Sequence, residues 1–450
     1  MPETLSFAQR GAALSRAGFG SSPEIPKILL VATDRWYPTA RFGLALANAG
    51  CNVEAVCPQG HPLALTRVGH RLYPYNGMLP LVSISRAIHA ATPDLVIPAD
   101  DLATRHLQQL HMRECEDVRS HSELCKLIER SLGAADSFAI VRARNDFMEV
   151  AREEGIRVPH TSVIASTGDL HSWIARRGFP TVLKANGTSG GDGVRVVNTV
   201  EEAERAFRKL QSPPLVARAV KRAVIDRDVT LVWPSLLRHR PVVNAQSYVV
   251  GHEATSSVFC WEGKVLAGLH FEVVEKMGPA GHATVVRWID HPQMTAAAEK
   301  IARRLKLSGV HGLDFMIEAG TGDAYLIEIN PRTTQVGHLS LGPERDLPAA
   351  LYAAVTGKEV QPATVLTRND TIALFPQEWK RDSTSPFLSS AYHDVPWGEP
   401  ELVRACMRQV PQNGTQRSSK HVVPQQNISA RAMAIQRARP QADCCAINPE

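Results

Sequence analysis

The 450-residue sequence predicts a mixed α/β (α+β) fold of two or three domains. Three observations support this. Strands and helices alternate from Lys27 onward, a lysine-bearing strand runs into a glycine-rich loop near residue 190, and a later hairpin carries carboxylates inside apolar strands. Because 44% of the residues are hydrophobic, a chain of this length can bury a sizeable core.

The first region has the pattern of a parallel α/β sheet covered on both faces. We expect strands at 27–32, 52–57 and 94–100 and helices at 36–49 and 79–91. Asp100 and Asp101 follow the last strand at its carboxyl end, where open α/β sheets usually contact ligands. Capping of the next helix by Asp101 is an equally good explanation.

The second region begins with a helical pattern over 120–154 that stops at Gly155. The expected elements that follow are strands at 161–165, 242–250, 254–261, 265–271 and 284–288 and helices at 169–177, 201–210 and 293–305. A hairpin over 312–330 completes this region. After about residue 411 the apolar periodicity disappears, which predicts disorder.

The segment FPTVLKANGTSGGDGVRVV, residues 179–197, places Lys184 and a cluster of glycines between two strands. Glycines leave backbone N–H groups uncovered, so the loop could close around a phosphate. From the loop alone, an ordinary hairpin turn is an equally good explanation. A P-loop is excluded because the lysine precedes the glycines, and a dinucleotide fingerprint is excluded because a strand follows them.

The later hairpin, 312–330, favours the phosphate loop over the ordinary turn as the explanation of residues 179–197. Glu328 and Asn330 point to one face of their strand, and the turn near residue 321 folds Asp314 back toward them. Oxygen ligands of this kind suit Mg²⁺ or Mn²⁺, held jointly with the phosphates of a nucleotide. Arg332, two residues further along, would meet a phosphate from the side. A solvent-facing acidic hairpin explains carboxylates within LDFM and YLIEI poorly.

Four motifs in this order resemble the ATP-grasp superfamily: the lysine strand, the glycine loop, QSYVVGHEAT and EINPR. Their arrangement is similar to the carboxylate-amine ligases and the large chain of carbamoyl-phosphate synthase. The resemblance runs from Lys27 to about Gly357 and implies an ATP-grasp fold with an N-terminal Rossmann-like pre-ATP-grasp domain. Implied domains are 26–118 for the pre-ATP-grasp domain and 119–360 for the ATP-grasp domain, with a lid subdomain at about 160–248. Outside them we expect a flexible arm at 1–25, a packing segment at 361–409 and a disordered tail at 410–450.

The resemblance implies ATP as the nucleotide, with a set of binding residues that extends over several elements. Phosphate contacts are expected from Arg144 and Lys184, beneath a mobile lid of backbone amides at Gly190, Gly191 and Gly193. The hinge beside adenine would be 243–249, which includes Gln246, Tyr248 and Val249. Glu253 would bind the ribose hydroxyls.

The same resemblance implies a metal and catalytic set. Asp314, Glu328 and Asn330 would hold Mg²⁺ (or Mn²⁺), and Arg332 would contact the transferred phosphoryl group. Lys276 and Arg287 flank the expected substrate-side loop. His311 and His338 could reach the site, with a structural hydrogen-bonding role equally open. The stretch 218–241 matches nothing in the family.

The implied function is ATP- and Mg²⁺-dependent joining of a small-molecule carboxylate to an amine or similar nucleophile through an acyl phosphate, with release of ADP and phosphate. Two alternatives remain open: a Mg-ATP-binding regulatory or assembly protein, and a small-molecule kinase. Most of the net charge of +5 lies in the last fifty residues, so nucleic acid is not an expected partner. Eight scattered cysteines and the lack of a long apolar run favour a cytoplasmic protein away from membranes. A homodimer is compatible with this assignment.

Overall fold

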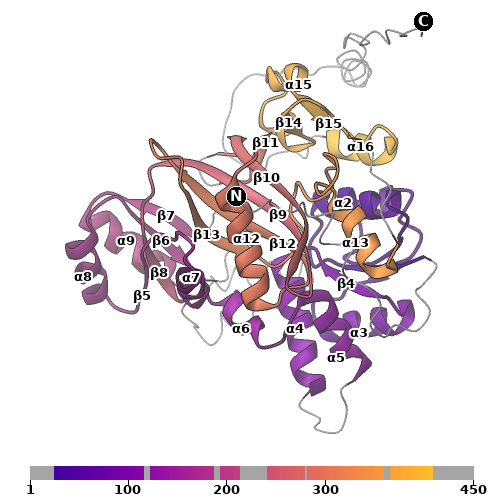
Figure 1. The fold of residues 1–450 in the computed structure, drawn as a ribbon, viewed down its shortest axis with the longest axis horizontal. Helices are drawn as coiled ribbons and strands as arrows, with labels where there is room; N and C mark the ends of the chain where they lie inside the picture. Colours follow the sequence, from indigo (N-terminus) through magenta and orange to yellow (C-terminus); the bar gives the residue numbers. More distant parts are fainter. Residues whose placement is uncertain are drawn as a thin grey trace, which may run out of the picture.

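The computed structural model describes residues 25–115, 122–186, 193–212, 241–278, 281–358 and 365–408 (Figure 1). Gly190 and Gly191 of the predicted lid lie outside these residues, as does Gly187 of the same loop. So do most of the unmatched stretch, the predicted N-terminal arm and the predicted tail. Within the described residues, no helix is both long enough and apolar enough to cross a bilayer.

The N-terminal domain contains a four-stranded parallel sheet in the order β3-β2-β1-β4. Its strands are β1 (Lys27–Val31), β2 (Asn52–Cys57), β3 (Leu72–Pro74) and β4 (Leu95–Pro98). One face packs on α3 (Pro80–Ala91), α4 (Asp101–Cys115) and α5 (Glu123–Leu132), and the other on α2 (Tyr37–Asn48). Because both faces are covered, β1 is apolar and fully buried from Ile28 to Val31. This confirms the predicted parallel α/β domain.

The next unit is a small antiparallel sheet in the order β5-β8-β6-β7, on the left of Figure 1. Its strands are β5 (Thr161–Ile164), β6 (Thr181–Ala185), β7 (Val194–Val197) and β8 (Val243–Ser247). Apolar side chains of α8 (Thr167–Arg177) and α9 (Val200–Leu210) cover one face. Lys184 on β6 lies opposite Asn244 on β8.

The largest sheet has seven strands in the order β13-β12-β9-β10-β11-β14-β15. Its bounds are β9 (Gly251–Trp261), β10 (Lys264–Lys276), β11 (Ala283–Trp288), β12 (Gly309–Glu318), β13 (Ala324–Asn330), β14 (Thr371–Leu374) and β15 (Tyr392–Asp394). The helices α7 (Arg144–Glu153) and α12 (Pro292–Leu305) share a core with one part of the sheet. A second core joins the sheet to α13 (Leu347–Thr356) and α2, and thereby to the N-terminal domain.

The last described segment extends this sheet, because β14 pairs with β11 through Val285 and Ala373. It also carries α14 (Gln377–Arg381), α15 (Phe387–Ser390) and α16 (Pro400–Met407), of which α15 and α16 are labelled in the upper part of Figure 1. Asp394 on β15 binds His338 at 2.6 Å and pairs with Arg41 of α2. A buried ion-pair cluster therefore ties this segment to both the large sheet and the N-terminal domain.

The helical pattern predicted over 120–154 consists of three helices: α5, α6 (Ser137–Arg142) and α7. The first break follows α5 at Gly133, where φ is +100° and a Cβ would lie 2.4 Å from the carbonyl oxygen of Lys306. Only glycine tolerates both conditions. The short strands β3, β14 and β15 were not predicted, because three or four residues carry too little periodicity.

Candidate nucleotide and metal site

The hairpin of β12 and β13 brings three oxygen-bearing side chains together. Asp314 lies directly opposite Glu328, with a bulge immediately after it. The Nδ2 group of Asn330 donates to Asp314 Oδ2 at 2.9 Å, and Thr255 on β9 donates to Asp314 Oδ1 at 2.9 Å. Burial and the neighbouring Glu328 raise the pKa of Asp314 to about 6. Two partly buried carboxylates that face each other form a site that a divalent cation would stabilise.

Arg144 is the first residue of α7 and reaches the hairpin from the side. Its Nη2 donates to Glu328 Oε1 at 2.6 Å, and the side chain is 11% exposed. Its Nε and Nη1 groups are buried, with no acceptor among the residues that the structure describes. Buried donors without acceptors are costly, so an anion beside these two groups would be favourable.

Lys184 is buried on β6 of the small sheet. Burial and then Arg144 lower its pKa to about 8, while Glu328, Asp314 and Glu253 oppose this shift. The ammonium is therefore within electrostatic reach of the hairpin, although 130 to 144 positions separate them along the chain. Next to it, the amide of Ala185 donates to the Gly193 carbonyl at 2.9 Å, which closes the described end of the glycine loop.

The segment predicted as a hinge, 243–249, comprises β8 and the two residues that follow it. Gln246 is buried, and its Nε2 donates to Thr161 Oγ1 on β5 at 3.1 Å. Tyr248 is 40% exposed and Val249 half-buried just after the strand. The side-chain amide of Gln246 is thus hydrogen-bonded within the small sheet, whereas Tyr248 and Val249 after it are accessible to solvent.

Glu253 and Lys276 form an ion pair on the neighbouring strands β9 and β10, with Nζ 2.6 Å from Oε1. The predicted ribose residue and one predicted substrate-side residue therefore share a place on the sheet. Arg287 lies on β11 opposite Glu272, 3.6 Å from its Oε2. Glu253 is among the charges that act on the pKa of Lys184.

Arg332 connects the hairpin to the N-terminal domain. Its Nε lies 3.1 Å from Asp101 Oδ1, and its Nη2 donates to Asn330 Oδ1 at 3.3 Å. Its guanidinium carbon lies 5.5 Å from the centre of the Trp36 ring. Although burial opposes the charge, Asp101 raises the pKa of Arg332 above its ordinary value. The cation is therefore fixed where the two domains meet.

The two aspartates after β4 have different roles. Asp100 caps α4 by accepting from the Ala103 amide at 2.8 Å, and it also holds the amide of Thr33 at 2.7 Å. The expectation of capping by Asp101 was wrong by one residue, because the helix begins at Asp101 and its cap precedes it. Asp101 is left free to pair with Arg332, at the sheet edge where a ligand contact was predicted.

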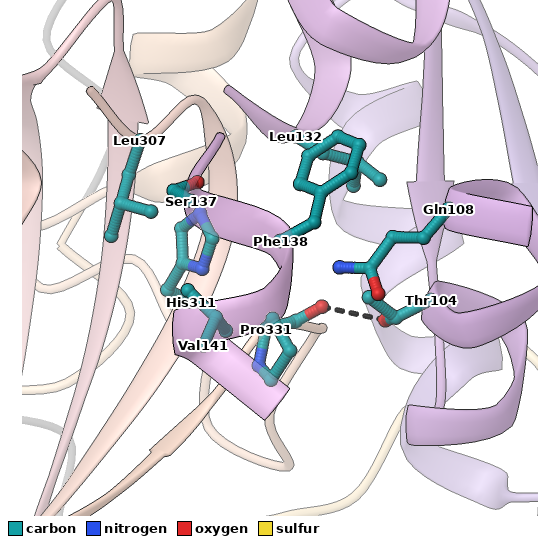
Figure 2. A pocket seen from close by; sticks show the side chains of 9 residues that line it. All are labelled: Thr104, Gln108, Leu132, Ser137, Phe138, Val141, Leu307, His311 and Pro331. Atoms are coloured by element: carbon teal, nitrogen blue, oxygen red, sulfur yellow. Dashed lines mark hydrogen bonds between the residues drawn. The ribbon is translucent and has the colours of Figure 1, made fainter. Parts of the chain in front are cut away.

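Backbone contacts fix this junction. Thr104 Oγ1 on α4 donates to the Pro331 carbonyl at 2.7 Å, directly after Asn330 (Figure 2). Figure 2 also shows a small pocket behind the hairpin, between α4, α6 and β12, with His311 on its wall. His311 Nε2 contacts the Ser308 carbonyl at 2.8 Å, and burial lowers its pKa to about 4. His311 and the Asp394-bound His338 therefore have structural hydrogen-bonding partners.

Sequence reasoning missed Trp36 and Thr255. Trp36 follows the first strand, so its place at the carboxyl end of the sheet was available as a signal. Thr255 and Asp314 lie 59 positions apart in the chain, and their contact depends on the pairing of β9 with β12. No local sequence pattern predicts the register between these two strands.

These elements identify the fold class of the protein. The N-terminal parallel domain, the small sheet with its buried lysine and the carboxylate hairpin of the large sheet make up the ATP-grasp fold. Residues 143–340 match the family model described as carbamoyl-phosphate synthase L chain, ATP binding domain. This match begins just before Arg144 and ends after Arg332, so it contains every described residue of the candidate site except those of the N-terminal domain.

Curated relatives are distant. Formate-dependent phosphoribosylglycinamide formyltransferase of Burkholderia pseudomallei (strain 668) is 24% identical over 366 residues, which cover 77% of this chain and 79% of the relative. Human mitochondrial pyruvate carboxylase is 25% identical over 204 residues, 44% of this chain but 16% of that protein. The chain thus spans less than a fifth of the length of the pyruvate carboxylases that it matches.

Solved structures agree on the fold. An ADP complex of N5-carboxyaminoimidazole ribonucleotide synthetase has a TM-score of 0.52 at 16% identity and covers 76% of this chain and 82% of its own. The biotin carboxylase domain of Hydrogenobacter thermophilus 2-oxoglutarate carboxylase, with MgADP and bicarbonate, also has a TM-score of 0.52, at 14% identity. It covers 74% of this chain and 70% of its own.

Proposed function

We propose that this protein is an ATP- and Mg²⁺-dependent ligase that joins a carboxylate to an amine or similar nucleophile. The observation that carries the proposal is the convergence of Arg144, Lys184, Asp314 and Glu328 from α7, β6, β12 and β13 on one place. Two cations and two carboxylates from distant segments are difficult to explain as packing, since burying them costs free energy. These four side chains are suited to bind a nucleoside triphosphate together with its metal ion.

The nucleotide would lie between the small sheet and the large one. Lys184 and the unpartnered donors of Arg144 support phosphate binding, with the backbone of Gly190, Gly191 and Gly193 as a lid. Adenine would lie beside 243–249, against backbone and the side chains of Tyr248 and Val249 rather than against Gln246, whose amide is engaged with Thr161. Glu253 would take the ribose hydroxyls, at the expense of its ion pair with Lys276.

The donor set fits the implied metal. Asp314, Glu328 and the Oδ1 atom of Asn330 offer only oxygen, which suits Mg²⁺, with Mn²⁺ as an alternative. When bound, the cation would neutralise charge on the nucleotide phosphates and polarise them. Its binding would compete with the Arg144–Glu328 pair, which would leave Arg144 free for phosphate.

The chemistry balances as follows. A carboxylate oxygen attacks the γ-phosphorus of ATP, ADP leaves, and an acyl phosphate forms. The nucleophile then attacks the acyl carbon, inorganic phosphate leaves, and the nucleophile loses a proton. Bringing two anions together requires positive charge, which Lys184 and Arg332 supply in a site that contains little water. Arg332 is placed for the transferred group, next to Asn330 and at the N-terminal domain.

The distant relatives indicate which carboxylates to test first. One relative is named as formate-dependent, and one structural neighbour was solved with bicarbonate. Both are one-carbon acids, so formate and bicarbonate belong in the first set of substrates. The same neighbour was solved as a dimer, and we include a homodimer in the proposal, with sedimentation velocity as its test.

The test is release of ADP and phosphate from the purified protein with Mg-ATP, one carboxylate and pooled amines. Release only when both an acid and an amine are present supports the ligase. Release of ADP without phosphate, with a phosphorylated small molecule, indicates a kinase instead. Tight Mg-ATP binding without release from any pool favours the regulatory or assembly protein. Glu318→Gln, on the same hairpin but outside the cluster, is the matched control for site variants.

A further inference from the structure

A second cluster of metal-binding side chains lies in the N-terminal domain, at the end of α4 that is remote from Asp101. His111 and Cys115 are four residues apart on α4, so they share a helix face. Cys125 and Glu129 have the same spacing on α5, which packs beside α4. The ligand atoms of His111, Cys115 and Cys125 all lie within 4.8 Å of one another.

The distances fit a tetrahedral metal. Bond lengths of about 2.1 Å to nitrogen and about 2.3 Å to sulfur put those two ligand atoms about 3.6 Å apart at a tetrahedral angle. His111 Nε2 and Cys115 Sγ are 3.6 Å apart. Glu129 Oε1 contacts the same His111 Nε2 at 2.7 Å, a hydrogen-bond distance that would have to open for the carboxylate to become the fourth ligand. The Glu129 side chain is 48% exposed and is free to make that movement.

The environment also suits a fixed ligand set. His111 and Cys125 are buried, and the His111 ring packs edge-on against Phe138 with centroids 5.5 Å apart. Cys115 is exposed, which leaves a route of entry for an ion. The other cysteines of the described residues do not join this cluster.

We propose that His111, Cys115, Cys125 and Glu129 form a structural zinc site that clamps α4 to α5. Two thiolates and an imidazole favour zinc over the oxygen-seeking Mg²⁺ of the nucleotide site. Four protein ligands leave no open position, which is typical of a structural rather than a catalytic site. Binding displaces a proton from each thiol, so the site is loaded more readily as pH rises. The clamp would fix the far end of the helix whose first residue pairs with Arg332.

The experiment uses the full chain, purified with reductant, stripped by chelator and then titrated with Co²⁺ as a spectroscopic substitute for Zn²⁺. We expect ultraviolet thiolate-to-cobalt charge transfer and the visible bands of tetrahedral cobalt, both removed by one equivalent of Zn²⁺. Cobalt at the oxygen-only hairpin would lack the thiolate band. Metal analysis of the unstripped protein should show zinc in a one-to-one ratio to the chain.

Cys115→Ser is the main variant, because its exposed thiol is unnecessary for packing. It should abolish the thiolate band and lower bound zinc toward none, whereas Cys406→Ser on α16 should retain both. A double variant of Cys444 and Cys445, which lie outside the described residues, should also retain both. Absence of a thiolate band in the parent protein overturns the proposal. So does a band that survives Cys115→Ser, or one that disappears in the Cys444 and Cys445 variant.

Discussion

Arg332 and Asp101 form an ion pair, 3.1 Å between Nε and Oδ1, across the junction of the hairpin and the N-terminal sheet. The pair places a cation beside Asn330 and under the ring of Trp36. Because Asp101 begins α4 and Arg332 follows β13, the two domains meet at the place where the proposed phosphoryl group would be transferred.

Asp101→Asn tests whether this pair serves activity or stability. Since Asp101 is 40% exposed, loss of the pair should cost no more than about 1 kcal/mol of unfolding free energy. The rate of ADP release should fall by a larger factor than this small loss of stability can explain, because Arg332 loses the partner that orients it. Urea unfolding and steady-state kinetics measure the two effects. Glu123→Gln, which breaks the exposed pair with Lys126, is the control and should change neither. Equal, small effects in both variants would contradict a role in positioning.

Glu328→Gln should abolish turnover while preserving the fold. The substitution removes one charge from the proposed metal set and weakens the contact with Arg144, but it keeps the shape of a side chain that is only 32% exposed. Circular dichroism and ADP release provide the two readouts, with Glu318→Gln as the control on the same hairpin. Unchanged turnover would show that this hairpin does not hold the metal.

Lys184→Ala should weaken Mg-ATP binding by roughly 1.5 to 3 kcal/mol, the range for a hydrogen bond to a charged group. Titration calorimetry measures the loss directly. Lys209→Ala, an exposed lysine at the end of α9 in the same small sheet unit, should bind ATP normally. Full affinity in the Lys184 variant would mean that the glycine loop is not a phosphate loop.

The pH dependence of ATP binding should also report Lys184. Burial lowers its pKa to about 8, so the free protein loses this positive charge as pH rises through 8. Affinity should then fall by at most about tenfold per pH unit, since one proton is involved. Burial of the Lys184 ammonium also lowers the stability of the folded protein. This destabilisation is fully present below pH 8 and disappears as pH rises toward 10.5, the ordinary pKa of a lysine. Lys184→Arg keeps its charge and should remove the slope; an identical slope would assign it to another group.

Asp394→Ala should cost about 3–5 kcal/mol of unfolding free energy, because it leaves Arg41 and His338 buried without their partner. Burial opposes the charged form, but Arg41 and His338 outweigh it and hold the pKa of Asp394 below its usual range. Its stabilisation is therefore present above the ordinary carboxylate pKa and lost as pH falls below it. Denaturant unfolding across pH measures both effects. The exposed Asp370→Ala is the control, and equal stability of the two variants would contradict the cluster's role.

The sequence predicted most elements to within a residue or two where periodicity was strong. The helix expected at 293–305 is α12, Pro292–Leu305, because six of its side chains are buried on one face. The breaks at Gly133 and Ala143 within the helical pattern over 120–154 were not predicted, because the apolar pattern continues through them. The close approach of Lys306 to Gly133 comes from a segment far away in the chain, so it leaves no local signal.

By itself, the sequence determined the elements and the chemistry of their residues: a lysine strand before glycines, and a hairpin whose apolar strands carry Asp314, Glu328 and Asn330. Local periodicity and residue type suffice for both. Only the tertiary structure decided the partners of these side chains. Arg332 meets Asp101, Glu253 meets Lys276, and His111 meets Cys125. Each of these contacts depends on the register of strands or the packing of helices, which the whole core fixes through many small contacts rather than any local pattern.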